Sequence, residues 1–242
     1  MRVAVVSDIH GNLRGLNACL DDLKAQGGAD QVVAAGDLCL DGPRSREVLE
    51  RLEAIGARSV RGNTDRMIGE VGAPIEDEED AEGVEFQRAQ IGDRWTRWLR
   101  DLPFSLRIGE GPEALLVVHA NPKTDDEYIY PDADDAVLER IFSGVEERTI
   151  AFGHLHLSYA RMWRDRLLVN VASAGLPKDG DPRACYAIFT QRCGGWEVKH
   201  RRVAFDVDKV AREIEKSGIP RPKRRIEVLR RHRYKFLKEQ IP

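Results

Sequence analysis

The chain has 242 residues, 42% of them hydrophobic, and a formal net charge of −3. This length and apolar content suffice for one sizeable core with room for an appendage. The charge does not fit a globally basic nucleic-acid binder, and no apolar run approaches the roughly 20 residues that a membrane-spanning helix needs. The N-terminal apolar stretch is too short for a signal peptide, and the four cysteines show no metal-binding or redox spacing. We therefore expect a cytoplasmic protein that does not contact a membrane.

Strand and helix patterns alternate along the first sixty residues. The sequence predicts buried strands at 3–6, 32–35 and 57–60, with amphipathic helices between them at about 12–26 and 43–55. The second helix is opened by Gly42-Pro43, in the order favoured at a helix start. This rhythm indicates βαβ units and a largely parallel sheet.

The rhythm breaks over residues 66–103. An acidic run at 76–80 precedes a predicted helix at about 85–99, and we interpret the run as a solvated loop, with a mobile flap over the site as the alternative. Beyond this region the remaining predicted elements are strands at 115–118, 149–152, 167–171, 185–189 and 196–205, and then helices at about 207–217 and 223–238. The strands at 185–189 and 196–205 have the alternation of an antiparallel pair.

Blocks of polar residues that can bind metal ions follow five of the predicted strands. In chain order they read Asp8-Ile9-His10, Gly36-Asp37, Gly62-Asn63-Thr64-Asp65, His119 and Gly153-His154-Leu155-His156. Any one block alone is more often packing or a turn, but chance would not place nearly every histidine at a strand end. Imidazoles, carboxylates and one amide oxygen form a ligand set for two divalent ions. Such a pair is suited to in-line attack on phosphorus.

These blocks resemble the calcineurin-like metallophosphoesterase superfamily, and within it the small prokaryotic phosphodiesterases related to diadenosine tetraphosphatase. Residues 170–183 resemble the segment that follows the last metal histidine in that branch. The resemblance implies an α/β fold, a four-layer α/β/β/α sandwich of two mixed sheets flanked by helices. We expect a metallophosphoesterase domain over 1–205, in which 66–103 is a helical and acidic insertion near the site. A C-terminal helical extension over 206–242 would pack on that domain.

The resemblance also implies how the ligands and the chemistry are divided. The first ion would be held by Asp8, His10 and His156, the second by Asn63, His119 and His154, and Asp37 would bridge them. These seven residues would be the catalytic ones. Mn²⁺ is the preferred ion, with Fe, Ni or Zn as alternatives. A hydroxide held between the ions would be the nucleophile of a phosphoester hydrolase.

One position departs from the family pattern. The third block usually carries a histidine that is thought to protonate the leaving oxygen or bind the phosphoryl group, and here that position is Thr64. Members of the small phosphodiesterase branch often lack this histidine too. A missing general acid costs roughly 10²–10⁴-fold where the leaving group needs a proton. We therefore expect a phosphodiesterase that favours diesters or activated esters over alkyl monoesters.

Four further residues are candidates for substrate contacts: Asn12, Asp65, Arg66 and Arg183. Asn12 could touch a phosphoryl oxygen, although a helix N-cap is an equal reading. The two arginines could bind phosphate through charge-assisted hydrogen bonds or simply be solvated. Asp65 could instead bond neighbouring backbone or Arg66.

Other functions stay open on the sequence alone. The same family could supply a phosphomonoesterase, a protein phosphatase, or a catalytically weak regulatory or scaffold protein. The basic tail from residue 221 to 238 could bind nucleic acid, but we favour an amphipathic helix docked on the domain with its basic face in water. The expected partner is a phosphoester substrate, with a nucleotide as one option. Nothing in the pattern indicates an oligomeric state.

Overall fold

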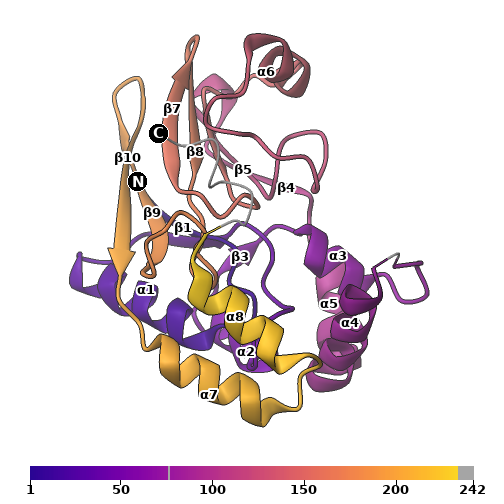
Figure 1. The fold of residues 1–242 in the computed structure, drawn as a ribbon. Helices are drawn as coiled ribbons and strands as arrows, with labels where there is room; N and C mark the ends of the chain where they lie inside the picture. Colours follow the sequence, from indigo (N-terminus) through magenta and orange to yellow (C-terminus); the bar gives the residue numbers. More distant parts are fainter. Residues whose placement is uncertain (76, 234–242) are drawn as a thin grey trace.

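The computed structural model of the protein describes residues 1–75 and 77–233. Two mixed five-stranded sheets lie face to face, in the orders β10-β9-β1-β2-β3 and β4-β5-β6-β8-β7 (Figure 1). The first sheet consists of β1 (Arg2–Val6), β2 (Gln31–Ala34), β3 (Arg58–Ser59), β9 (Ala184–Arg192) and β10 (Gly195–Val203). The second consists of β4 (Ser105–Ile108), β5 (Leu115–Val118), β6 (Thr149–Phe152), β7 (Tyr159–Trp163) and β8 (Arg166–Asn170). The predicted sandwich of two mixed sheets is confirmed.

Helices cover the outer face of each sheet (Figure 1). Along β1 the side chains alternate, so that Val3 and Val5 pack between the sheets while Ala4 and Val6 face the helices. The first sheet is covered by α1 (Leu13–Ala25), α2 (Ser45–Ala54), α3 (Asn63–Gly69), α4 (Glu78–Ile91) and α5 (Asp93–Arg100). The second sheet is covered by α6 (Asp135–Phe142). The resulting order of layers is helix, sheet, sheet, helix.

The predicted strands at 115–118 and 149–152 are β5 and β6 with unchanged bounds. Five elements of the described residues were not predicted: α3, α6, β4, β7 and the short 3-10 helix η1 (Gly111–Glu113). The two missed strands lie at opposite edges of the second sheet. Two residues of each strand are exposed, so neither carries the continuous apolar run that marks β5 and β6.

The acidic run was predicted to be a solvated loop, and within the described residues that prediction is wrong. Asp77 caps α4 by accepting hydrogen bonds from the backbone N–H groups of Glu79 and Asp80, which form the first turn of the helix. Carboxylates are favourable at this end of a helix because the N-terminus carries partial positive charge. The single helix predicted at 85–99 is also wrong, because Gly92, with a φ of 77°, separates α4 from α5.

The last two helices of the described residues are α7 (Val207–Ser217) and α8 (Pro222–Arg231), which lie together across the helical face of the first sheet (Figure 1). Ile214 and Leu229 pack in one apolar cluster with Leu176, which belongs to the loop after β8. The predicted last helix was too long: it ends at Arg231, and His232 turns into the left-handed region with a φ of 51°. Residues 234–238 of that prediction lie outside the described residues. No helix in the described ranges is both long and apolar enough to cross a bilayer.

Candidate metal centre

The five metal-binding blocks meet between the two sheets. β1 and β2 are parallel, as are β5 and β6, so the loops at their carboxyl ends lie at matching edges of the two sheets. Two glycines of the blocks permit the close approach. A Cβ on Gly62 would lie 2.2 Å from Oδ1 of Asp37, and a Cβ on Gly153 would lie 2.3 Å from Oδ2 of Asp8. These positions therefore have no room for a side chain.

Asp8, His10 and His156 form the first cluster, and all three are buried. Nε2 of His156 lies 3.1 Å from Oδ1 of Asp8 and 3.2 Å from Nε2 of His10. Three potential ligand atoms thus point at one another, with Asp8 and His10 supplied by the first sheet and His156 by the second.

His119, His154 and Asn63 form the second cluster. Nε2 of His119 lies 3.0 Å from Oδ1 of Asn63 and 3.2 Å from Nδ1 of His154. Asp37 lies between the clusters, with Oδ1 3.4 Å from Nε2 of His119 and Oδ2 3.6 Å from Nε2 of His10. This cluster, too, combines residues from both sheets.

Backbone strain is concentrated at these positions. Asp8, His10, Asp37, His154 and His156 all have φ values between 48° and 66°, in the left-handed region that non-glycine residues rarely adopt. Such strain persists only where the surrounding structure enforces it, and it is typical of functional sites. Here it turns each side chain out of the strand direction and toward the space between the sheets.

Three histidines are oriented by backbone carbonyl groups. Nδ1 of His119 lies 2.8 Å from the carbonyl oxygen of Ala35, and Nδ1 of His156 lies 2.6 Å from that of Leu176. In His154 the two ring nitrogens exchange roles: Nε2 lies 2.8 Å from the carbonyl oxygen of Asp126. A ring nitrogen that donates to a carbonyl leaves the other nitrogen unprotonated, which is the form that binds a metal ion.

The amide of Asn63 faces the same space as the histidines of the second cluster. Its oxygen lies among acceptor atoms: Nδ1 of His154 at 3.1 Å, Nε2 of His119 at 3.0 Å and both carboxylate oxygens of Asp37 at 3.3 Å. Turning the amide would place its NH₂ group there as a donor, whereas the oxygen in this position is the atom that would bind a metal ion. The donor set therefore fits two divalent ions, with one cluster for each.

The electrostatics of the clusters agree with this reading. Burial would raise the pKa of Asp8, but the imidazoles of His156 and His119 outweigh burial and lower that pKa to about 2. Burial lowers the pKa of His119, and the carboxylate of Asp37 outweighs burial and raises it to about 10. Burial lowers the pKa of His154 and lowers that of His156 to about 4, so these two imidazoles stay neutral, which is the form that binds a metal ion.

Asn12 and Asp65, predicted as substrate contacts, make internal hydrogen bonds. The oxygen of Asn12 caps α1 by accepting from the N–H of Gly15, and its amide nitrogen donates to the carbonyl of Gly175. Asp65 is fully buried and accepts hydrogen bonds from three backbone N–H groups, those of Asp37, Leu38 and Gly62. Asp65 thereby ties the second and third metal-binding blocks together.

The two predicted arginines are both paired with aspartates. Arg66 donates to Asp125 at 2.9 Å and to Asp126 at 2.6 Å, so it holds the loop whose carbonyl group orients His154. Arg183 donates to Asp181 on an exposed surface. The structure thus places Arg66 close to the second cluster through Asp126.

Thr64, at the position of the family's usual histidine, is also buried. Its hydroxyl and its backbone N–H both donate to Oδ1 of Asp37, at 2.9 Å and 3.0 Å. The side chain therefore fixes the carboxylate that lies between the two clusters.

Sequence reasoning missed three residues near the centre. Asp41 lies 3.4 Å from Nδ1 of His10, Tyr128 stacks on His154 with ring centroids 4.4 Å apart, and Lys178 lines the cavity beside His10. Burial lowers the pKa of Lys178, while Asp41 and the buried aspartates of the centre oppose that shift. Of these three residues, only Lys178 could have been found from the sequence, because it lies inside the segment 170–183, which as a whole resembles the family.

Comparisons with known proteins match this geometry. A model described as the calcineurin-like phosphoesterase superfamily domain matches residues 1–193. An uncharacterized protein from Methanocaldococcus jannaschii is 30% identical over 232 residues, which cover 90% of this chain and 93% of that protein. The crystal structure of a metallophosphoesterase from Sphaerobacter thermophilus is 25% identical, with a TM-score of 0.76, and covers 96% of this chain and 99% of its own.

A further relative matches only part of this chain. The symmetrical bis(5'-nucleosyl)-tetraphosphatase from Erwinia tasmaniensis is 32% identical over 123 residues, which cover 50% of this chain and 44% of that protein. The likeness therefore extends over less than half of the tetraphosphatase.

Proposed function

This chain belongs to the calcineurin-like phosphoesterase superfamily and has intact metal-binding residues, and we propose that it is a dinuclear metal-dependent phosphodiesterase. The observation that carries the proposal is the convergence of seven side chains whose facing atoms are all potential metal ligands. When bound, two divalent ions, with Mn²⁺ as our first candidate, would activate water and bind phosphoryl oxygens.

The residues have separate roles in this proposal. Asp8, His10 and His156 would hold one ion, and Asn63, His119 and His154 the other. Asp37 would bridge, because each of its oxygens faces one cluster. Thr64 and the backbone hydrogen bonds to the outer imidazole nitrogens would keep the ligands in place before an ion binds, so that little reorganisation is needed.

Thr64 favours esters whose leaving group needs no proton. Its hydroxyl is engaged with Asp37, so no imidazole stands at this position to protonate a poor leaving group. Alkyl monoesters need such a proton most, whereas esters with acidic leaving groups need it least. For the substrate class, the tetraphosphatase relative supports placing dinucleoside polyphosphates and other nucleotide esters first in a screen.

The test uses metal-stripped protein with and without added Mn²⁺. Hydrolysis of bis-p-nitrophenyl phosphate and of p-nitrophenyl phosphate is measured side by side. We expect Mn²⁺-dependent turnover that favours the diester and that falls by at least about 10²-fold in His119→Gln. His200→Gln is the matched control, because His200 lies outside the clusters and bonds the carbonyl of Asn170.

Two outcomes would count against the proposal. Absence of turnover in a sample that binds two ions would favour a regulatory role. Turnover of the monoester at a rate equal to or above that of the diester would contradict the assignment as a phosphodiesterase, but not the metal-dependent chemistry. It would not bear on Thr64, because both probes release the same acidic leaving group.

A further inference from the structure

His10 differs from the other three histidines of the centre in how its outer nitrogen is held. His119, His154 and His156 each place that nitrogen against a backbone carbonyl group at 2.6–2.8 Å. Nδ1 of His10 is buried and makes no hydrogen bond of normal length within the described residues. The acceptor beside it is a side chain, Oδ2 of Asp41, at 3.4 Å.

Asp41 reaches this position through an unusual loop. Leu40 and Asp41 both lie in the left-handed region, with φ values of 74° and 56°. The following Gly42 packs directly on the loop after β1, where a Cβ would lie 2.0 Å from the carbonyl oxygen of His10. The Asp41 side chain is nevertheless 37% exposed, so its own packing does not fix the carboxylate.

Arg225 of α8 fixes the position of the Asp41 carboxylate. Its side chain is only 4% exposed, and Nη1 donates to Oδ1 of Asp41, the oxygen that does not face His10. Nε donates to the carbonyl of Pro220 at 2.9 Å, which anchors the guanidinium at the start of its own helix. In α4, a Cβ on Gly83 would lie 2.7 Å from Nη2, so the missing side chain makes room for the arginine.

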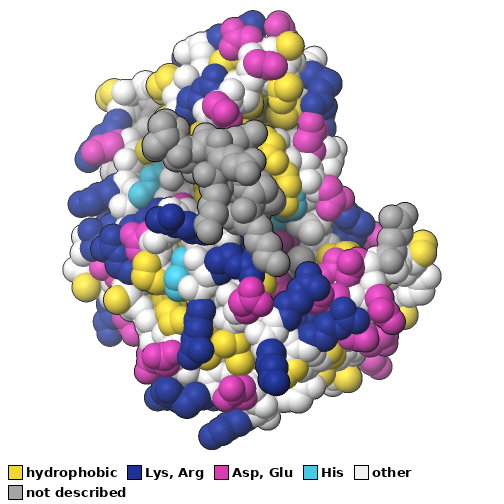
Figure 2. All heavy atoms as spheres, in the orientation of Figure 1, with side chains coloured by type: hydrophobic (Ala, Val, Ile, Leu, Met, Phe, Trp, Pro, Cys, Tyr) yellow, Lys and Arg dark blue, Asp and Glu magenta, His cyan; other side chains and the backbone are white. Residues whose placement is uncertain are grey.

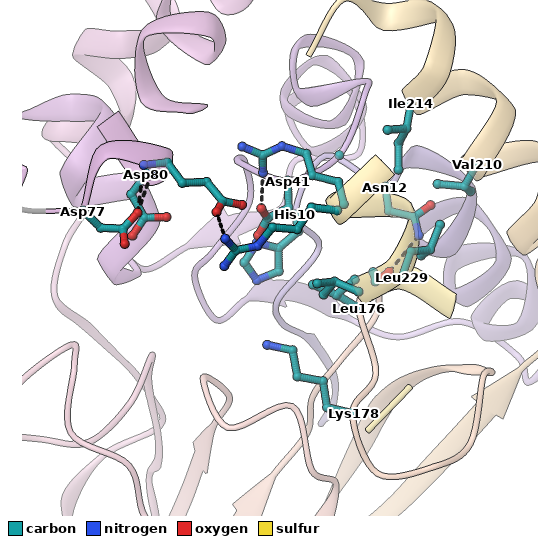
Figure 3. A pocket seen from close by; sticks show the side chains of 16 residues that line it. His10, Asn12, Asp41, Asp77, Asp80, Leu176, Lys178, Val210, Ile214 and Leu229 are labelled. Atoms are coloured by element: carbon teal, nitrogen blue, oxygen red, sulfur yellow. Dashed lines mark hydrogen bonds and ion pairs between the residues drawn. The ribbon is translucent and has the colours of Figure 1, made fainter. Parts of the chain in front are cut away.

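These contacts form a chain from the C-terminal helix to the metal centre. Figure 3 shows Asp41 beside His10 among the side chains that line a cavity of about 240 Å³, with a dashed line from an arginine to Asp41. The apolar wall of the cavity comes from Leu176 and from α7 and α8. The family model matches residues 1–193, so Arg225 lies outside the part of the chain that it covers.

We propose that Asp41 and Arg225 are positioning residues for the metal centre. With an ion on Nε2 of His10, Asp41 would accept the Nδ1–H of that imidazole, and Arg225 holds Asp41 on the side from which it can do so. The inference rests on the proposed metal centre but not on any substrate. Removal of such partners of a metal-binding histidine typically costs about 10–100-fold in metal affinity.

The experiment measures Mn²⁺ binding to the metal-stripped full chain by calorimetry, with Asp41→Asn, Arg225→Met and the double variant. We expect each single variant to weaken one of the two binding events by about 10–100-fold and to leave the other unchanged. Because Arg225 acts through Asp41, the double variant should bind no more weakly than Asp41→Asn alone. Arg224→Met is the matched control: it lies one residue away, pairs with Glu79 and is 64% exposed, and it should bind like the unaltered chain.

Several results would overturn the inference. If the Arg225→Met variant binds two ions with unaltered affinity, the contact between Arg225 and Asp41 contributes only to packing. A fall in the thermal stability of that variant would not change this conclusion. Additive losses in the double variant would show that Arg225 does not act through Asp41. Should Arg225→Met fail to fold, Asp41→Asn decides alone, and normal binding by it would refute the role. A chain that binds no Mn²⁺ at all would instead remove the metal centre itself.

Discussion

Thr64 holds the carboxylate of Asp37, which we propose as the bridging metal ligand. Its hydroxyl and backbone N–H share one acceptor, Oδ1 of Asp37. Loss of the hydroxyl would leave a buried carboxylate with one donor fewer and free it to rotate.

We therefore expect Thr64→Val to weaken Mn²⁺ binding by about 10-fold or more, since residues that orient metal ligands typically contribute at that level. Thr64→Ser keeps a hydroxyl and should recover most of the affinity. Calorimetric titration of the two variants against the unaltered chain measures the effect. Equal affinity in all three would mean that the backbone N–H alone fixes Asp37.

The residues of the site could be predicted where a pattern in the sequence marked them. The seven residues grouped from the sequence come together because each follows a strand whose end is marked by glycine, by an apolar run or by both. Asp41 and Arg225 had no such signal. They are 184 positions apart, and only the docking of α8 brings them into contact.

At the scale of elements, α1 is joined to the first sheet by a partly buried polar contact. Asp22 of α1 accepts hydrogen bonds from Arg201 of β10, at 2.8 and 2.9 Å, and from the hydroxyl of Tyr186 of β9, at 2.8 Å. The hydrogen bonds from Arg201 lower the pKa of Asp22 below its ordinary value. The contact therefore stabilises the fold only while Asp22 is ionised.

The sign of the pH dependence follows from that direction. Because the pKa is lower in the folded chain than in the unfolded one, this stabilisation is present above the unfolded value near 4 and is lost as the pH falls through the folded value. Asp22→Asn should cost about 1–3 kcal/mol in unfolding free energy at pH 7 and progressively less below pH 4. Urea unfolding across this range measures it, with Asp21→Asn, exposed on the same helix, as the control. A cost that does not change with pH would indicate lost packing.

Element prediction failed where burial was incomplete or a single residue decided the outcome. β4 and β7 are half-exposed edge strands, and α3 begins at Asn63 inside a metal-binding block, where helical periodicity is too short to detect. Gly92 divides a region of otherwise continuous helical composition. The acidic run joined a helix because Asp77 caps it and because arginines of the C-terminal helix pair with Glu79.

At the scale of the whole molecule, oppositely charged side chains meet where α7 and α8 contact the rest of the chain. Figure 2 shows basic side chains over the region of α8 next to acidic side chains toward α4. Arg221 pairs with Glu82, and Arg224 with Glu79. Beneath these contacts lies the apolar cluster of Leu176, Ile214 and Leu229. Several arginines of the predicted basic face therefore form ion pairs within the chain. The net charge of the sequence alone could not reveal these ion pairs.

We propose that α7 and α8 unfold together with the sandwich. Ile214→Ala should lower the unfolding free energy by about 2–4 kcal/mol because it leaves a cavity in this cluster. The transition should stay single by circular dichroism and by tryptophan fluorescence. Glu215→Ala, at an exposed neighbouring position, should be nearly neutral. An early, separate transition in Ile214→Ala would show that the helices are an independent unit.

Each metal cluster takes ligands from both sheets, and this gives the proposed ions a mechanical role. His156 joins Asp8 and His10 across the interface, and His119 joins Asn63 in the same way. Ions bound there would clamp the two halves of the sandwich, and they would bind the folded chain only. Mn²⁺ at 100 times its dissociation constant should then add about 2.7 kcal/mol per site to stability, and a chelator should remove it. The melting temperature would thus report metal occupancy without any substrate, and hydrogen exchange should slow first in the strands that flank the clamp.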